Sequence, residues 1–344
     1  MIVKENTVVY VACPALSATG GPELLHQLVH SLRINGVNAY MFYQPSMLNP
    51  VHDAYKIYAN PFVETIEDDN RNVIIVPEEK SFIDLLAKYS SIRKIIWWLS
   101  VDNYYIRFNL ASRIMNKLSR YTSIFENYSY EARTKTLSKT SDLLKVDQIA
   151  NASLHFVQSY YAYEHLVEKG IDNSKILRLS DYVNDSFLSV DLESVKTRKK
   201  DIVIYNPKKG FHYTKKIIRS LRDINFIALQ NMTRQEVLDT MVSSKVYIDF
   251  GNHPGKDRMP REAALCGNCI ITGRRGSAGN SVDVSIPEKY KFEDTVENMK
   301  QVGEVIRSCL VDYERRVEDF SSYRERIRNE KAVFENDVRS IFLG

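Results

Sequence analysis

The stretch that decides the fold runs from Val246 to Gly276 and reads VYIDFGNHPGKDRMPREAALCGNCIITGRRG. Apolar runs at 246–250 and 268–272 are typical of buried strands. Between them, small residues followed by Gly267 favour a short helix that packs closely on a sheet. Strand, helix and strand in this order predict two parallel strands joined by a crossover helix, and hence an α/β sheet covered on both faces.

The same alternation of apolar runs and helical spacing extends over the rest of the chain. It restarts after residue 200, which predicts two doubly wound, Rossmann-like domains that face a cleft. We place one domain at 1–190, the second at 200–325, and an exposed charged linker, ESVKTRKKD, at 193–201. Further strands are expected at 7–16, 39–43, 73–76, 95–99, 155–158, 202–205 and 226–229.

The C-terminal segment is strongly helical and charged. Phe334, Val338 and Ile341 place apolar side chains along its end. We expect this helix, at 326–344, to cross back and pack on the first domain.

Composition limits the classes of function. The chain has 344 residues, of which 44% are hydrophobic, and a formal net charge of +4. This charge is too small to predict nucleic-acid binding, and no window is apolar over the ~20 residues that a membrane span needs. We expect a cytoplasmic protein whose membrane contact, if any, is peripheral and at the inner face. Four cysteines are expected as buried thiols, namely Cys13, Cys266, Cys269 and Cys309.

Glu262 is the first candidate for chemistry in the opening stretch. We place it in the first turn of the short helix, where its carboxylate can accept two hydrogen bonds from ribose hydroxyls. The unpaired N–H groups of the same helix N-terminus suit a phosphate. The alternative is that Glu262 only complements the helix dipole, and the residues by themselves leave both open.

The text REAALCGNCII resembles the donor-binding signature of GT-B glycosyltransferases, especially bacterial surface-polysaccharide (group 1 type) transferases whose segment reads EGFGLPVLEAMACGxPVI. An early Gly-Gly loop, then SYYAYEHLVEKGI, then YNPKKG follow the family's order of parts. The resemblance implies that the first domain binds the acceptor and the second binds a nucleotide-sugar. It also implies that Glu262 contacts the ribose and that Lys208 or Lys209 contacts the diphosphate.

One position departs from this family pattern. The family's first glutamate, which helps to hold the donor sugar, falls on Pro254 here. The loop supplies instead a basic group suited to phosphate or a carboxylated sugar, and His253-Pro254 is similar to a pair found near the donor phosphate in transferases of CMP-activated acidic sugars. The sequence thus resembles a divergent branch. The basic group consists of His253, Lys256, Arg258 and Arg261.

Two glycine-containing turns are further candidates. TGRRGSAGN, at 272–280, lets the backbone approach a donor closely at Gly276 and Ser277 while Arg274 or its neighbour supplies charge. In the first domain, SATGGPE follows the first strand, so Gly20 and Gly21 are expected to border the cleft. The alternatives are an exposed basic turn and a plain helix start with Pro22 at the first helical position.

A catalytic base is harder to assign. Asp102 follows the apolar strand KIIWWLSV, where a carboxylate can take a proton from an acceptor hydroxyl, although turn formation explains the same residue. The segment 104–145 alternates apolar and basic residues at helical spacing. Packing on the first domain explains that pattern, and contact with anionic lipid or a lipid-linked acceptor is the alternative.

The resemblance implies a glycosyltransferase that moves a sugar from a nucleotide-sugar donor to a hydroxyl of a glycan or lipid-linked acceptor, in bacterial surface-polysaccharide synthesis. No D-x-D motif occurs in the chain, so we expect no metal and no cofactor, with Lys, Arg and helix N-termini neutralising the phosphate. The alternatives are a CMP-acidic-sugar transferase, a nucleotide-sugar epimerase of the same fold, and a non-catalytic carbohydrate-binding partner.

Overall fold

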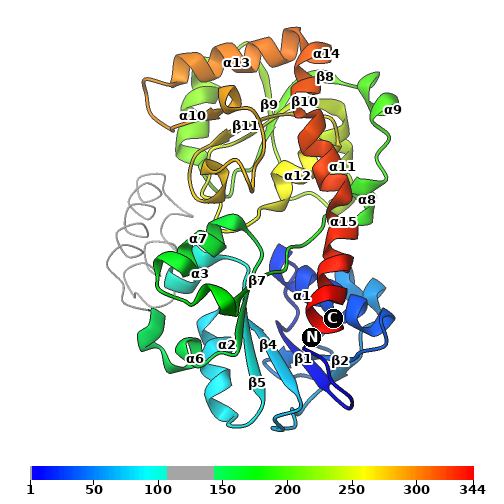
Figure 1. Ribbon diagram of the computed structural model, residues 1–344. Helices are drawn as coiled ribbons and strands as arrows, with labels where there is room; N and C mark the ends of the chain where they lie inside the picture. Colours follow the sequence, from blue (N-terminus) through cyan, green and yellow to red (C-terminus); the bar gives the residue numbers. More distant parts are fainter. Residues whose placement is uncertain (1, 107–142) are drawn as a thin grey trace. The chain divides into compact units, whose positions relative to one another are not determined.

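The computed structural model describes residues 2–106 and 143–344, which divide into two compact units (Figure 1). Unit 1 comprises residues 2–106, 143–182 and 330–344 of the described chain. Unit 2 comprises residues 183–329. Each unit is built on its own parallel sheet.

Within the described residues, unit 1 contains a seven-stranded sheet of order β3-β2-β1-β4-β5-β6-β7. All neighbouring strands are parallel, as the alternation of apolar runs predicts. The apolar runs become the central strands because side chains on both of their faces are buried. The strands are β1 Val8–Pro14, β2 Asn38–Gln44, β3 Phe62–Val63, β4 Val73–Pro77, β5 Arg93–Trp98, β6 Leu154–Val157 and β7 Ile176–Arg178.

Helices cover both faces of this sheet. Side chains alternate along a strand, so Tyr10 and Ala12 of β1 face one core, shared with α2, α3, α6 and α7, while α1 packs along β1 and β2. The helices are α1 Gly20–Ile34, α2 Lys80–Leu85, α3 Val101–Ile106, α6 Asp147–Ala150 and α7 Tyr160–Glu168, with 3-10 turns η1 Asp53–Tyr58, η2 Leu86–Lys88, η3 Leu143–Lys145 and η4 Asn173–Lys175.

The described part of unit 2 contains a five-stranded parallel sheet of order β12-β11-β10-β8-β9. The strands are β8 Lys200–Tyr205, β9 Asn225–Ala228, β10 Ser244–Asp249, β11 Cys269–Gly273 and β12 Lys291–Phe292. Its helices are α8 Asp185–Leu188, α9 Leu192–Lys196, α10 Phe211–Ser220, α11 Arg234–Ser243, α12 Arg258–Leu265, α13 Met299–Val311 and α14 Tyr313–Arg316, with η5 Ser277–Gly279, η6 Glu288–Tyr290 and η7 Val317–Phe320.

Most residues of the segment 193–201 are exposed, as predicted, but the prediction that this segment links the two domains is wrong. Val195 is buried, and the chain passes from unit 1 to unit 2 between Tyr182 and Val183. The Lys199 ammonium donates to three backbone carbonyls, those of Met241, Ser244 and Cys266, at 2.6 to 3.0 Å. The segment is thus part of unit 2, to which Lys199 anchors it through these backbone carbonyls.

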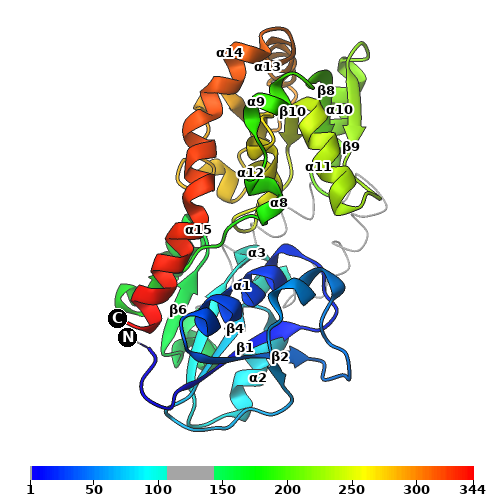
Figure 2. The ribbon, with the colours of Figure 1, turned by 90° about the vertical axis from the view of Figure 1, so that its right-hand side faces the viewer.

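The last helix, α15 Ser321–Phe342, contributes to both units, and from Glu330 onward it belongs to unit 1. There the Phe334 ring packs against Tyr182 and the Phe342 ring against Phe156, with centroids 5.4 and 5.8 Å apart. The backbone N–H of Ile2 donates to the carbonyl of Ile341 at 3.1 Å, so the two ends of the chain lie side by side (Figure 2).

No described helix is long and apolar enough to cross a membrane. The predicted amphipathic segment at 104–145 lies largely outside the described residues, which omit 107–142. The four cysteines are buried free thiols, as expected.

Candidate functional site

The candidate site lies on unit 2, at the carboxyl edge of its sheet. Strands β8, β10 and β11 are parallel neighbours, so the loops that follow them, at 206–210, 250–257 and 274–277, leave the sheet at one edge. Open α/β sheets bind ligands at this edge. These loops carry most of the predicted donor-binding residues.

Two glycines let the three loops touch. Gly210 has φ +65°, and a Cβ there would lie 2.3 Å from the carbonyl carbon of Phe250. Gly276 has φ +64°, and a Cβ there would lie 2.1 Å from the carbonyl oxygen of His253. Ser277 completes the second contact, because its N–H donates to that His253 oxygen at 2.8 Å and its hydroxyl donates to the Gly255 carbonyl at 2.5 Å. The predicted glycine turn therefore holds the β10 loop in place.

Four ionisable side chains, from the end of β10 and from the loops that follow β8 and β10, lie together. His253 Nδ1 lies 2.9 Å from Asp257 Oδ2, and His253 Nε2 lies 3.6 Å from Asp249 Oδ1. Lys209 Nζ lies 3.7 Å from Asp249 Oδ2 and donates a close hydrogen bond to Asp257. The Asp249 and His253 side chains are fully buried, while Lys209 and Asp257 keep 26% and 23% of their side-chain surface exposed. We call these four residues the charged cluster.

The charges of the cluster support one another. Burial alone raises the pKa of Asp249, but the Lys209 ammonium and His253 outweigh it and hold that pKa well below its usual value. Burial alone lowers the pKa of His253, and so does Lys209, yet Asp249 and Asp257 raise it above its ordinary value. Because removing one partner leaves a buried charge unpaired, each member depends on the others.

The cluster also bears on the expectation that no metal binds. Ligand atoms of Asp249, His253 and Asp257 lie within 4.8 Å of one another, a grouping that can hold a metal ion. Lys209 contacts both carboxylates, however, so a metal ion here would have to displace its ammonium. Carboxylate, imidazole and carboxylate suit a divalent cation, and the ammonium competes for the same oxygens.

The structure separates the two lysines that the sequence left as alternatives. Lys209 is paired inside the charged cluster. Lys208 is exposed, and its side chain makes no ion pair with the described residues, while its backbone N–H donates to Asn206 Oδ1 at 3.0 Å. Lys208 therefore has the charge that is open to an anion, and Lys209 organises the loop.

The position of Glu262 requires a correction. Helix α12 begins at Arg258, with Asp257 as its N-cap residue, so Glu262 lies in the second turn and not in the first. Pro260 suggests a later helix start, because proline favours the first helical position, but here it is the third helical residue. A proline is tolerated at the third helical position, since N–H groups of the first turn have no intrahelical acceptor. Glu262 is 8% exposed.

The predicted basic group does not form one exposed patch. Arg261 is 1% exposed, and its guanidinium donates to the backbone carbonyls of Asp257 and Lys256 at 3.3 and 3.1 Å. Lys256 is buried and Arg258 is half-buried. Arg261 thus holds the backbone of the β10 loop in place.

The two arginines after β11 each form an ion pair within unit 2. Arg274 pairs with Glu288 at 2.7 Å and keeps 31% of its side chain exposed. Its neighbour Arg275 pairs with Asp294, with Nε 3.1 Å from Oδ1. Arg274 is the more exposed of the two and has the more exposed partner.

The remaining predicted residues lie on unit 1. Gly20 and Gly21 are half-buried at the start of α1, which begins at Gly20, so that Pro22 is the third helical residue and not the first. Asp102 lies in the first turn of α3, is 3% exposed, and accepts a hydrogen bond from the Tyr161 hydroxyl at 3.0 Å. Its carboxylate is held by the fold of unit 1.

Two acids were missed by sequence reasoning. Asp249 is the last residue of β10, and its place at a strand end was the signal that could have found it. Glu78 follows β4 directly, is 5% exposed, and accepts a hydrogen bond at Oε2 from the Leu99 backbone N–H at 2.9 Å. Burial raises the pKa of Glu78 to about 7. A carboxyl group with such a pKa is suited to accept a proton near neutrality.

Two parallel sheets, each covered by helices, give the chain the GT-B fold of the two-domain glycosyltransferases, which confirms the predicted fold. HepE from Anabaena, solved in complex with UDP-glucose, superposes with a TM-score of 0.62 at 10% identity, over 97% of this chain and 98% of that one. A sucrose-phosphate synthase from Thermosynechococcus elongatus gives 0.62 at 12% identity over 97% and 98%.

The lipopolysaccharide outer core galactosyltransferase WaaB, in its apo form, gives a TM-score of 0.53 at 11% identity, over 98% of this chain and 100% of that one. No family model matches the sequence, and no curated protein matches it either. At these identities the similarity establishes the fold and not the activity.

Proposed function

We propose that the protein transfers a sugar from a nucleoside-diphosphate sugar to a hydroxyl group of a glycan or lipid-linked acceptor. One observation carries the proposal: the carboxyl-edge loops of unit 2 are held together by close contacts at Gly210 and Gly276. They place Lys208, which is exposed and has no ion pair with any described residue, beside the start of α10. Backbone N–H groups at a helix start and a free ammonium suit a diphosphate. HepE, a solved protein of this fold, holds UDP-glucose in one structure and UDP in another, which supports the same class of donor.

In this proposal the departing diphosphate is stabilised without a metal ion. Lys208 neutralises developing charge on the leaving phosphate, and N–H groups of Phe211 and the following residue donate to its oxygens. Lys209 keeps the β8 loop in position through its carboxylate partners. Glu262 accepts hydrogen bonds from the ribose, a role that its family position supports.

A base on unit 1 accepts the proton of the attacking hydroxyl if the reaction inverts. Asp102 was predicted for this task, and Glu78 is a second candidate because its pKa of about 7 matches proton transfer near neutrality. Asp102→Asn and Glu78→Gln separate them: the base is the residue whose loss lowers turnover by about 100-fold or more while donor affinity stays unchanged.

A panel of UDP-, GDP-, dTDP- and CMP-sugars in a thermal-shift assay, followed by product analysis, tests the proposal. We expect stabilisation by a nucleoside-diphosphate sugar, and release of nucleotide with a transferred or hydrolysed sugar. Recovery of an epimerised donor would assign an epimerase, and binding without any turnover would assign a carbohydrate-binding partner. A response to CMP-sugars alone would favour the His253-Pro254 interpretation, which the complete burial of the His253 side chain does not support.

The place of the reaction in bacterial surface-polysaccharide synthesis, at the inner face of the membrane, belongs to the same proposal and depends on the acceptor. It is supported by family resemblance in the sequence. Turnover with extracted lipid-linked glycans, compared with free oligosaccharides, tests it directly.

A further inference from the structure

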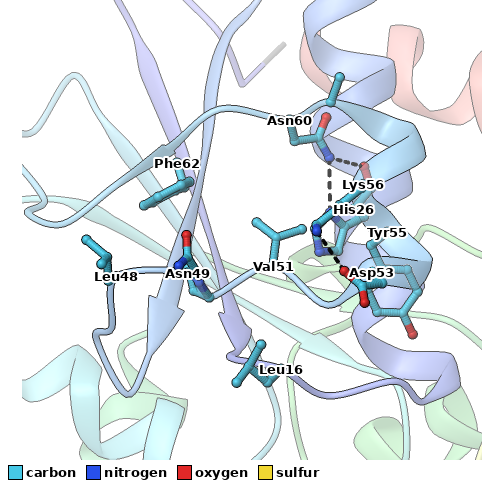
Figure 3. Close-up of a pocket in the computed structure, with 12 residues that line it drawn as sticks. Leu16, His26, Leu48, Asn49, Val51, Asp53, Tyr55, Lys56, Asn60 and Phe62 are labelled. Atoms are coloured by element: carbon cyan, nitrogen blue, oxygen red, sulfur yellow. Dashed lines mark hydrogen bonds and ion pairs between the residues drawn. The ribbon is translucent and has the colours of Figure 1, made fainter.

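Unit 1 contains a cavity of about 600 Å³ between α1 and the segment that follows β2 (Figure 3). This volume falls within the roughly 300–1,000 Å³ of small-ligand sites. His26 contributes from α1, Asn49 and Val51 from the loop after β2, Asn60 from the turn after η1, and Phe62 from β3. We call it the α1 cavity.

The lining of the α1 cavity is electrically balanced. Its charged side chains are Asp53 and Lys56, which pair with each other at 2.7 Å and are exposed. His26 is buried, and this burial lowers its pKa to about 4, so the ring is neutral at pH 7. A diphosphate or a carboxylate would find no unpaired cation in this lining, and the ligand that fits is neutral.

Besides the polar groups of His26 and Tyr55 and the paired charges, the lining contains two amides with unused hydrogen-bonding capacity toward the described residues. Asn49 is exposed, and its side chain makes no hydrogen bond with the described residues. Asn60 donates from Nδ2 to the His26 carbonyl at 2.8 Å, which fixes the amide while its Oδ1 accepts no hydrogen bond from the described chain. An amide offers donors and acceptors together, which matches hydroxyl groups that also do both.

An apolar surface completes the cavity. The Phe62 ring is 39% exposed and packs edge-on against Tyr43, with centroids 5.8 Å apart. Val51 and Leu16, the latter 51% exposed, lie on the same lining. A flat ring beside amides suits a pyranose, which has apolar C–H faces and polar edges. An alkyl or isoprenyl chain would instead cover the amides without satisfying them.

We propose that the α1 cavity binds a neutral glycosyl residue of the acceptor. The inference rests on the proposed function in that it assigns the bound sugar to an acceptor. The cavity belongs entirely to unit 1, however, so its binding of sugar is measurable in the full chain without any donor.

Saturation-transfer NMR on the full chain tests the inference with methyl glycosides of glucose, galactose, mannose and N-acetylglucosamine as probes. At least one should bind. Asn49→Ala should weaken binding about tenfold by removing one hydrogen-bonding group, and Phe62→Leu by a similar factor through loss of the flat ring. Phe62→Tyr should keep the affinity. Asn38→Ala is the matched control, since Asn38 is an exposed amide on β2 outside the cavity.

Absence of saturation transfer from every glycoside would overturn the inference, and so would binding that Asn49→Ala and Phe62→Leu leave unchanged. A response to geranyl phosphate alone would reassign the cavity to a lipid. A thermal-shift measurement with the nucleotide-sugar panel on the same sample separates the two proposals. Donor binding without glycoside binding refutes this inference alone, whereas glycoside binding without donor binding refutes the proposed function and leaves a carbohydrate site.

Discussion

Adjacent lysines in the β8 loop provide a sharp test of the site. Lys209→Met removes the ammonium that compensates Asp249 and Asp257, leaving two carboxylates with only His253 between them. Lys208→Met makes the same chemical change one residue away, on an exposed side chain without an ion pair among the described residues.

The expected magnitude follows from burial. Breaking a buried ion pair costs about 3–5 kcal/mol, and we expect the lower end, about 3 kcal/mol, because Lys209 and Asp257 keep about a quarter of their side-chain surface in water. A unit of this size loses roughly 2–4 °C of Tm per kcal/mol, so the Lys209→Met transition should fall by roughly 6–12 °C. Lys208→Met should stay within about 0.5 kcal/mol of the wild type.

Differential scanning fluorimetry and urea unfolding, both without ligand, measure the difference. Adding Asp257→Asn to Lys209→Met should restore part of the loss, because one of the two uncompensated charges disappears. If Lys209→Met melts like the wild type, or if Lys208→Met is equally damaging, then Lys209 does not organise the loop and the division of roles between the lysines is wrong.

Three further predictions concern other parts of the chain. Gly276→Ala should lower the free energy of unfolding by about 2–4 kcal/mol, because its Cβ would meet the His253 carbonyl oxygen at 2.1 Å. The control is Gly36→Ala, also at positive φ but with nothing within 4 Å of the added Cβ, which should cost only about 1 kcal/mol. Equal costs of the two substitutions in urea unfolding would argue against the close contact. Glu78 has a pKa of about 7 in the folded chain and 4.5 as its ordinary value, so the folded state binds more protons and the free energy of unfolding should fall by about 3 kcal/mol as pH rises through this window. Glu78→Gln should flatten that slope between pH 4.5 and 7, and an unchanged slope would show that other groups cause it. Excess EDTA should leave donor binding and turnover unchanged, and recovery of a lost activity by a divalent cation would assign a metal to Asp249, His253 and Asp257 in place of the Lys209 ammonium.

The fold was predictable because its signal is local. Parallel strands buried on both faces read as short apolar runs, and the expected strand at 246–250 corresponds to β10 within two residues at each end. The start of α12 was misjudged because a proline suits several positions of a first helical turn. The supposed linker was misjudged because Lys199 finds buried carbonyl acceptors that are distant in sequence.

The arrangement within the site could not be predicted from the sequence, because it depends on contacts between residues that are distant along the chain. The sequence does not distinguish Lys208 from Lys209, and only the fold brings Asp249 and Asp257 close to Lys209. His253 and Arg261 were expected to face a ligand, yet both are buried. The α1 cavity depends on Asn49, Asn60 and Phe62 meeting across a segment with no recognisable motif.

Calorimetric titration of the full chain with nucleoside-diphosphate sugars tests the central claim most directly, when the wild type is compared with Lys208→Met and Glu262→Ala. We predict that one donor binds the wild type and that each substitution weakens it by about tenfold or more, with the unliganded melting temperature of Lys208→Met unchanged. Binding that neither substitution affects, or no binding by any donor, would contradict the claim that the carboxyl edge of unit 2 holds a nucleotide-sugar.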